Sequence, residues 1–263
     1  MKIAAFNVQR LGRTKVNKED VREIIIKIVS QYSVVVLLEV MDVSGVAMET
    51  FLTHLNDYGD NRSNRYGMRC SKSLGQNRYK EKFVYFYRKK EVQILDSYQY
   101  RGNDVLTRKP FVLLLNCPKT VVQKLVLIPV HTKPSNAEAE LIALHDVVEV
   151  VRERWKKDNI MILGDFNADG DSLSKRKKEK LRISSAPYHW LIGDDVDTTT
   201  SNKTQKAYDR IVVYGESMRN AIVPDSAKAY NFKEELNLTQ EKTQSVSDHY
   251  PVELKLELEQ MAQ

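Results

Sequence analysis

A strand, a helix and a second strand are predicted by three adjoining segments, which read KLVLIPVH at residues 124–131, NAEAELIALHDVVEVVRERW at 136–155 and NIMILGDFNA at 159–168. The first and third segments are short apolar runs bounded by polar residues, which is typical of buried strands. The middle segment repeats apolar side chains every three or four residues, at Leu141, Leu144, Val148, Val151 and Trp155. This spacing predicts a helix whose apolar face covers a sheet.

The same alternation of strands and helices extends over the rest of the chain. Short β-rich apolar runs predict further strands at residues 2–7, 33–39, 82–88, 92–100, 111–116, 210–214 and 252–258. Other helices are predicted over residues 44–55 and from an N-cap at Asn17 to about Ser30, with Ile24, Ile25 and Ile28 on one face. The pattern favours an α/β or α+β domain built in layers.

The bulk composition is that of a globular protein. Of the 263 residues, 42% are apolar and 29% are charged, and no stretch is rich enough in Pro, Gly or Ser to be a linker. We therefore expect a single domain over residues 1–263. No run of about 18 apolar residues occurs, so no membrane-spanning segment is predicted. Sequons at Asn61, Asn202 and Asn237 fit a secretory history, and such triplets also arise by chance.

The two cysteines, Cys70 and Cys117, lie far apart in the sequence. Neither belongs to a C-x-x-C pair of the kind that indicates a zinc or redox site. We expect both to be small core or surface residues in preference to a disulfide.

The net charge of +6 is concentrated in two segments. Residues 61–90 carry ten Lys or Arg against one Glu, and residues 174–182 carry six against one. Such clusters attract polyanions such as DNA, and a solvated basic face explains them equally well. For the run at residues 175–180 a nuclear address, a chromatin contact and a solvated helix face are all open, and we favour the last.

Polar side chains fall where the predicted strands end. Four strands are closed or followed by residues that can bind a metal or carry a proton, namely Asn7, Glu39, His131, and Asp165 with Asn167. Ligands gather at one edge of such sheets beyond the strand ends, so these residues can converge if their strands run the same way. Asp209 and His249 stand just before predicted strands. Strands of the opposite direction would bring them to the same edge, which predicts mixed sheets.

The chemistry of these residues sets them apart from ordinary polar side chains. His131 ends an apolar strand, where an imidazole is costly to bury without a partner. Asp165 and Asn167, two apart beyond a buried strand, point the same way, so one can meet a hard cation and the other a phosphate oxygen. Asp248 and His249 are adjacent at a turn, which Asp248 could also merely cap. The remaining histidines, His54, His145 and His189, are explained as packed or exposed side chains.

Six segments resemble the deoxyribonuclease I family in order and spacing: KIAAFN at residues 2–7, NRYKE at 77–81, PVH at 129–131, GDFNA at 164–168, AYDRIVV at 207–213 and SDHYP at 247–251. The resemblance extends from residue 2 to about residue 258. The Ser-Asp-His-x-Pro motif recurs throughout the larger endonuclease, exonuclease and phosphatase superfamily, so it specifies fold and metal chemistry. The narrower assignment rests on the Tyr79-Lys80-Glu81 segment and on residues 190–192, 197–199 and 223–226.

The resemblance implies a four-layer sandwich of two packed mixed β-sheets flanked by helices. It also implies an endonuclease that hydrolyses double-stranded DNA with low sequence specificity and leaves 5′-phosphate ends. His131 and His249 would be the general base and acid, and Glu81 and Asp209 would be their respective partners. A carboxylate that accepts the imidazole N–H fixes the tautomer and orientation of the ring and raises its basicity.

The resemblance assigns further residues to metal and substrate. Glu39, with Asn7, Asp165 and Asp248 nearby, would hold Mg²⁺ or Mn²⁺, and Ca²⁺ would be stimulatory or structural, with Asp104 and Asp197 as candidate calcium ligands. The implied contacts to phosphate or DNA are Asn167, Arg108, Tyr79, Tyr208 and Arg10. The family also implies a secreted monomer, and a nuclear or endoplasmic-reticulum location is an alternative.

The sequence departs from the family pattern at three places. Met41 stands where relatives often carry an Arg that enters the minor groove, so that Arg10, Arg13 or residues 61–90 would supply the grip. The disulfide that commonly closes the loop after the Asp-x-Asn motif is missing, with Asp169, Asp171 and Lys206 in its neighbourhood. Those two acids could bind Ca²⁺, and a solvated loop is the favoured interpretation. Residues 66–70 match the actin-binding segment of some relatives poorly, so actin binding is not expected.

Two other functions compete with the nuclease hypothesis. A phosphoinositide phosphatase or sphingomyelinase of the same superfamily would use the same histidine and metal set. A catalytically inactive DNA-binding or partner-binding relative is the second alternative, and the intact set of two histidines and several carboxylates argues against it.

Overall fold

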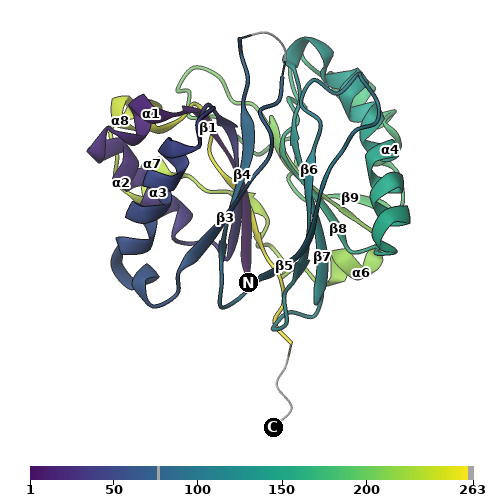
Figure 1. Cartoon of the computed structure of the whole chain (residues 1–263). Helices are drawn as coiled ribbons and strands as arrows, with labels where there is room; N and C mark the ends of the chain where they lie inside the picture. Colours follow the sequence, from purple (N-terminus) through teal and green to yellow (C-terminus); the bar gives the residue numbers. More distant parts are fainter. Residues whose placement is uncertain (76–77, 260–263) are drawn as a thin grey trace.

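The computed structural model describes residues 1–75 and 78–259, which form two six-stranded β-sheets packed face to face with helices on both outer sides (Figure 1). In the first sheet the strands lie in the order β11-β12-β1-β2-β4-β3, and in the second in the order β5-β6-β7-β8-β10-β9. The four-layer sandwich of mixed sheets that the resemblance implied is thereby confirmed.

The first sheet contains the two ends of the described chain. Its strands are β1 Lys2–Leu11, β2 Val34–Val40, β3 Tyr66–Cys70, β4 Lys82–Arg88, β11 Lys228–Ala229 and β12 Val252–Lys255. The helices that accompany it are α1 Arg13–Val16, α2 Glu19–Val29, α3 Val46–Asp57, α7 Phe232–Glu235 and α8 Gln240–Val246. Figure 1 shows these helices together on one outer side.

The second sheet is formed by the middle of the chain. Its strands are β5 Gln93–Gln99, β6 Phe111–Asn116, β7 Lys124–His131, β8 Ile160–Asp165, β9 Tyr188–Trp190 and β10 Asp209–Tyr214. The long helix α4 Ala137–Trp155 covers its outer face, with the short helix α6 Glu216–Asn220 nearby (Figure 1). The other short helix in this part of the chain is α5 Lys175–Glu179.

Side chains alternate along the strands between two apolar layers, because successive strand residues point to opposite faces. Ile3, Val36 and Leu163 belong to the core between the sheets. Phe6 and Leu37 point outward to the core shared with α2 and α3, while Ile128 and Ile162 pack with residues of α4. The predicted helix faces, with Ile24, Ile25 and Ile28 on α2 and Leu141, Leu144, Val148 and Val151 on α4, are buried.

Several predicted element bounds need correction. β1 continues past Asn7 to Leu11 through a register shift against β2. Asn17 is not a helix N-cap; it ends α1, and α2 begins at Glu19 after Lys18. The favoured helix face at residues 175–180 is present as α5. The short elements α1, β3, β9, β11 and α6 to α8 were not predicted, because pieces of two to seven residues show too little periodicity to identify.

Strand directions bring the predicted polar residues to one edge. β1 and β2 run parallel, as do β7 and β8, and a hydrogen bond from Asn7 on β1 to Asp165 on β8 places the C-terminal ends of both pairs at the same end of the molecule. β10 is antiparallel to β8, and β12 is antiparallel to β1, so these two strands begin at that end. In Figure 1 this is the end that carries α1, opposite the N-terminus.

Gly164 allows β7 and β8 to pair closely just before Asp165. Its φ of 144° belongs to backbone that other residues rarely adopt, and an added Cβ would lie only 2.0 Å from the carbonyl oxygen of Val130. The residue before Asp165 therefore has to be glycine for the two strands to stay in register.

Both cysteines are free, as predicted: Cys117 is buried and Cys70 is half-buried. None of the helices within residues 1–75 and 78–259 is both long and apolar enough to cross a membrane.

A reductant should leave the fold and any activity unchanged, because there is no disulfide for it to open. The expected result is the same melting temperature and the same rate of DNA cleavage with and without dithiothreitol. A large loss of either on reduction would contradict the free-cysteine assignment.

Candidate active site

Three strands of the second sheet place three candidate residues side by side. In the parallel pair β7 and β8, His131 lies opposite Asp165. In the antiparallel pair β8 and β10, Asp165 lies opposite Asp209. The register of the sheet therefore builds the row His131, Asp165, Asp209 at its edge.

The Asp165 carboxylate is the centre of the site and is almost fully buried. Its Oδ1 accepts the backbone N–H of Asn167 at 3.0 Å, and its Oδ2 accepts the side-chain amide of Asn7 on the first sheet at 3.1 Å. The Nε2 atoms of His131 and His249 each lie 3.6 Å from that same Oδ2. The two Nε2 atoms are thus separated by no more than twice that distance, close enough to flank one phosphorus atom.

Asp165 stays ionised because its partners outweigh its burial. Burial raises the pKa of a carboxyl group, but the charges of His249 and His131, with the Asn167 and Asn7 donors, hold the pKa of Asp165 below its ordinary value. A permanent negative charge therefore sits between the two imidazoles.

His131 is backed by Glu81, which lies in the loop just before β4. The imidazole Nδ1 is 2.5 Å from Glu81 Oε1. Arg108 Nε lies 2.6 Å from the same oxygen and forms an ion pair with it, although the geometry is not that of a hydrogen bond. Arg108 Nη1 donates a hydrogen bond to the His131 carbonyl at 3.2 Å. Burial and the charge of Arg108 lower the pKa of His131, whereas the carboxylates of Glu81 and Asp165 raise it. The effect of the carboxylates is larger, so the pKa of His131 lies above its ordinary value.

His249 is backed by Asp209, the first residue of β10. Its Nδ1 lies 2.7 Å from Asp209 Oδ2, and Thr198 Oγ1 donates to the same oxygen at 2.8 Å. Burial lowers the pKa of His249, but the carboxylates of Asp209, Asp165 and Asp248 raise it to about 10. Burial also raises the pKa of Asp209 to about 6, against the opposing charge of His249. His249 is therefore protonated at neutral pH.

Glu39 projects from the end of β2 toward the same groups. Burial raises its pKa, and the charges that act on it are those of His131, Glu81, Asp248 and His249. Within the described part of the chain no side-chain hydrogen bond of Glu39 occurs. Its φ of 60° lies in the left-handed region, which costs a non-glycine residue on the order of 1–3 kcal/mol. A carboxylate without a hydrogen bond, on a residue whose backbone is strained, fits a ligand that is not part of the protein.

The donor set suits a hard divalent cation. Glu39 and Asp165 offer carboxylate oxygens, and Asp248 is exposed with Oδ1 3.8 Å from His249 Nε2. Asn7 turns its amide nitrogen to Asp165, while its oxygen accepts the Gln9 N–H at 3.0 Å. Oxygen-rich sets of this kind are preferred by Mg²⁺, Mn²⁺ and Ca²⁺.

A second combination, Asp165, Asp209 and His249, brings one ligand atom from each residue within 4.8 Å of the others. Asp209 Oδ2 is already engaged by His249 and Thr198. We therefore interpret Asp209 as the partner of His249.

Several residues at this edge have a backbone in the left-handed region. Of the non-glycine residues with positive φ, Gln9, Arg10, Glu39 and Asn167 all belong to the strand ends that form the site. Such strain persists only where surrounding contacts fix it, and it is concentrated at functional sites.

Lys15 is a contributor that the sequence analysis missed. Its Nζ donates to the carbonyl of Val8 at 2.7 Å and to that of Gln9 at 2.8 Å, which holds the irregular end of β1 just after Asn7. Burial lowers the pKa of Lys15 to about 8, and the carboxylates of Asp248 and Glu39 oppose this change. No motif marks this lysine, since its role depends on carbonyls that only the bulge of β1 exposes.

The predicted substrate contacts surround these groups. The Asn167 amide donates to the Thr132 carbonyl at 3.1 Å, which fixes it beside Asp165. The Tyr208 ring lies 6.3 Å from the His249 ring, and Tyr79 is 72% exposed in the loop before β4. Arg10 is exposed at the end of β1 and lines a hollow together with Met41 and with α1 residues.

The candidate calcium residues lie in separate surroundings. Asp104 is exposed and pairs with Lys109 at 2.7 Å, so its charge already has a partner. Asp197 Oδ1 accepts Thr199 Oγ1 at 2.8 Å and Lys206 N–H at 3.1 Å, and the residue lines a polar hollow of about 470 Å³. Asp169 accepts the Ala207 N–H at 2.9 Å, so it ties the loop after Asn167 to the residues before β10.

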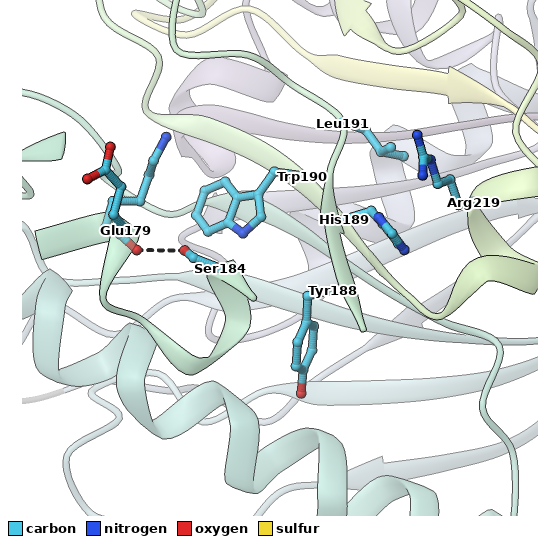
Figure 2. Close-up of a pocket in the computed structure, with 8 residues that line it drawn as sticks. Glu179, Ser184, Tyr188, His189, Trp190, Leu191 and Arg219 are labelled. Carbon is cyan, nitrogen blue, oxygen red and sulfur yellow. Dashed lines mark hydrogen bonds between the residues drawn. The ribbon is translucent and has the colours of Figure 1, made fainter. Parts of the chain in front are cut away.

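An open hollow of about 610 Å³ beside β9 contains none of the predicted site residues (Figure 2). His189 lines it and lies 2.8 Å from Glu216 through its Nε2. His145 is 2.7 Å from the Tyr188 hydroxyl, and His54 is exposed on α3. These three histidines thus have ordinary surroundings.

Comparisons with known proteins agree with this arrangement. A model of the endonuclease/exonuclease/phosphatase family matches residues 4–249. Human deoxyribonuclease-1-like 1 is 41% identical over 261 residues, which cover 98% of this chain and 85% of that protein. Rat deoxyribonuclease-1 is 39% identical over 264 residues, which cover 97% of this chain and 91% of that protein.

Solved structures share the fold. A family protein from Leptotrichia buccalis superposes with a TM-score of 0.68 at 18% identity and covers 98% of this chain and 99% of that one. The catalytic domain of human nocturnin with bound sulfate gives 0.65 at 14% identity, with 98% and 94% covered. The chain belongs to the endonuclease/exonuclease/phosphatase family, in its deoxyribonuclease I-like branch.

Replacing Lys15 by Met should destabilise the protein, because the Val8 and Gln9 carbonyls lose their donor. Leaving such groups without a partner costs roughly 1–3 kcal/mol. Urea unfolding measures the change, and Lys18→Met, at an exposed lysine nearby, is the matched control. Equal stability of the two variants would contradict the bracing role of Lys15.

Proposed function

We propose that this chain is a divalent-metal-dependent endonuclease that hydrolyses phosphodiester bonds of double-stranded DNA, with residues 1–263 acting as one catalytic domain. The observation that carries the proposal is the pair of imidazoles, His131 and His249, each backed by its own carboxylate and both 3.6 Å from one oxygen of Asp165. Membership in a branch whose relatives are named deoxyribonucleases supports the choice of DNA as substrate.

The two imidazoles divide the proton transfers. His131 takes a proton from water as the new bond to phosphorus forms, and His249 gives a proton to the 3′ oxygen as its bond to phosphorus breaks. The products are a 5′-phosphate and a 3′-hydroxyl. The raised pKa of His249, about 10, suits an acid that must hold its proton, while Arg108 beside Glu81 counteracts the rise at His131.

Glu81 and Asp209 act as positioning residues. Each accepts the Nδ1 proton of its histidine, which leaves Nε2 free to face the substrate. This fixes the tautomer of both rings before substrate arrives. Thr198 and Arg108 hold the two carboxylates in turn.

Glu39 and Asp165, with Asn7 and Asp248 nearby, would hold Mg²⁺ or Mn²⁺, which stabilises the negative charge that develops on the non-bridging phosphate oxygens. The strained backbone of Glu39 and its carboxylate without a hydrogen bond support this assignment. Ca²⁺ at Asp197 or Asp104 stays a prediction, and the pair between Asp104 and Lys109 favours Asp197.

Substrate contacts would come from side chains around the catalytic edge, namely Asn167, Arg108, Tyr79, Tyr208 and Arg10. Contacts to phosphate and sugar position a duplex without reading its sequence, which gives low sequence specificity. Met41 lines the same hollow as Arg10 and carries no charge, so Arg10 and its neighbours would make the contacts with the DNA there.

Location and assembly stay predictions. A secreted monomer that does not bind actin is what the resemblance implies. Of the three sequons, Asn202 and Asn237 are exposed, whereas Asn61 is buried and its amide donates to the Leu55 carbonyl at 2.8 Å. Glycan attachment in a secretory host is therefore expected at the two exposed sites and not at Asn61.

Replacing either His131 or His249 by Ala should lower the rate of supercoiled plasmid nicking by roughly 10²–10⁴-fold or more, because each removes one proton transfer. His54→Ala, at an exposed histidine on α3, is the control and should nick at the parental rate. Near-normal nicking by either active-site variant would refute the assignment.

The parent protein should nick plasmid with Mg²⁺ and Ca²⁺ present and stop when a chelator is added. Phosphate release from inositol lipids and choline-phosphate release from sphingomyelin are measured beside it. Nicking without lipid hydrolysis is the expected result. Lipid hydrolysis without nicking would assign the same histidine pair to the phosphatase or sphingomyelinase alternative, and binding of DNA without hydrolysis of any substrate would indicate an inactive relative.

A further inference from the structure

The most basic short segment of the chain is held rigidly. Residues 174–182 carry six Lys or Arg and one Glu. Helix α5 begins after Ser174, whose side chain accepts the Lys177 N–H. Leu173 and Leu181, on either side of the helix, are buried in the core under α4. The cations therefore stand on a fixed platform and not on a loose loop.

Two contacts place α5 at the catalytic edge. Lys177 Nζ lies 2.7 Å from Glu138 in the first turn of α4, and α4 begins shortly after His131 closes β7. The loop that leads into α5 starts from Asn167, and its Asp169 is tied to Ala207, two residues before Asp209. The helix thus adjoins the end of the second sheet that carries the site.

Part of this charge has no partner. Lys177 pairs with Glu138, Lys178 pairs with Asp194, and Arg182 donates to the Ala186 carbonyl at 2.9 Å. Lys175, Arg176 and Lys180 are exposed and make no ion pair with any residue that the structure describes. Two cations on α5, Lys175 and Arg176, and a third at its C-cap, Lys180, therefore face solvent beside the active site.

We propose that α5 is a second phosphate-contact surface, which binds the backbone of the DNA duplex beyond the nucleotides held at the catalytic edge. The inference rests on the proposed function. Fixed cations on one rim can meet phosphates along a duplex, and each such pairing releases counterions, so binding becomes salt-dependent but independent of sequence. The surface lengthens the DNA footprint without adding specificity.

The chemistry of α5 favours nucleic acid over a membrane. Helices that lie on membranes present an apolar face beside their cations. The five residues of α5 are all charged, and the leucines that flank it point into the core. This surface offers charge alone, which fits a polyphosphate backbone.

The test compares two charge-matched double variants. Lys175→Gln with Arg176→Gln removes two of the unpaired cations of α5. Lys119→Gln with Lys255→Gln removes two exposed lysines, one in the turn before β7 and one at the end of β12, at the opposite end of the sheets. All four side chains are exposed, so both variants should unfold like the parent, and they change the net charge equally.

The measured quantity is kcat/KM for plasmid nicking between about 50 and 200 mM NaCl, a range over which counterion release changes affinity strongly. A plot of log kcat/KM against log salt should have a negative slope, to which each phosphate that the protein neutralises contributes roughly −0.9. In the α5 variant this slope should be less steep than in the parent by about 1–2. The control variant should keep the parental slope. An α5 slope equal to that of the parent or the control overturns the inference, whereas a parent that does not nick DNA overturns the proposed function instead.

Vesicles containing phosphatidylserine provide the remaining arm. Parent and α5 variant should sediment with them equally weakly. Vesicle binding that disappears in the α5 variant, with an unchanged salt slope on DNA, would assign the surface to a membrane and refute the DNA contact.

Discussion

The buried carboxylate of Asp165 is the constraint on which the rest of the site depends. A charge in this position is costly unless every oxygen has a partner. Its partners come from both sheets, since Asn7 lies on β1 and His249 just before β12 in the first sheet, while His131 ends β7 of the second sheet and Asn167 follows β8. One carboxylate thus joins the two layers and orients both imidazoles, which is how a site becomes rigid before substrate arrives.

The sheets provide the register that this arrangement needs. Gly164 lets β7 approach β8 closely, so that His131 and Asp165 lie opposite each other. Next to these regularly paired strands, the backbone is strained at Glu39 and in the bulge of β1 after Asn7. Lys15 satisfies the carbonyls that the bulge exposes. Regular strand pairing therefore sets the positions of the site residues along the sheet edge, and local backbone distortion sets the direction in which their side chains point.

The sequence predicted the parts of the fold that follow from local pattern. Strands 82–88, 111–116 and 124–131 were predicted at their observed bounds, because each is an apolar run with polar ends, and the convergence of His131, Asp165 and Asp209 followed from strand direction. The bulge of β1, the lysine that braces it, the burial of Asn61 and the short edge strands depend on distant contacts that no local pattern encodes.

The measurement that tests the central role of Asp165 most directly is nuclear magnetic resonance of the histidine rings in the parent and in the isosteric Asp165→Asn variant. The account predicts that the ring signals of His131 and His249 both shift, because both Nε2 atoms face the altered group, while those of exposed His54 stay in place. A shift at only one of the two active-site rings, or at neither, would contradict it.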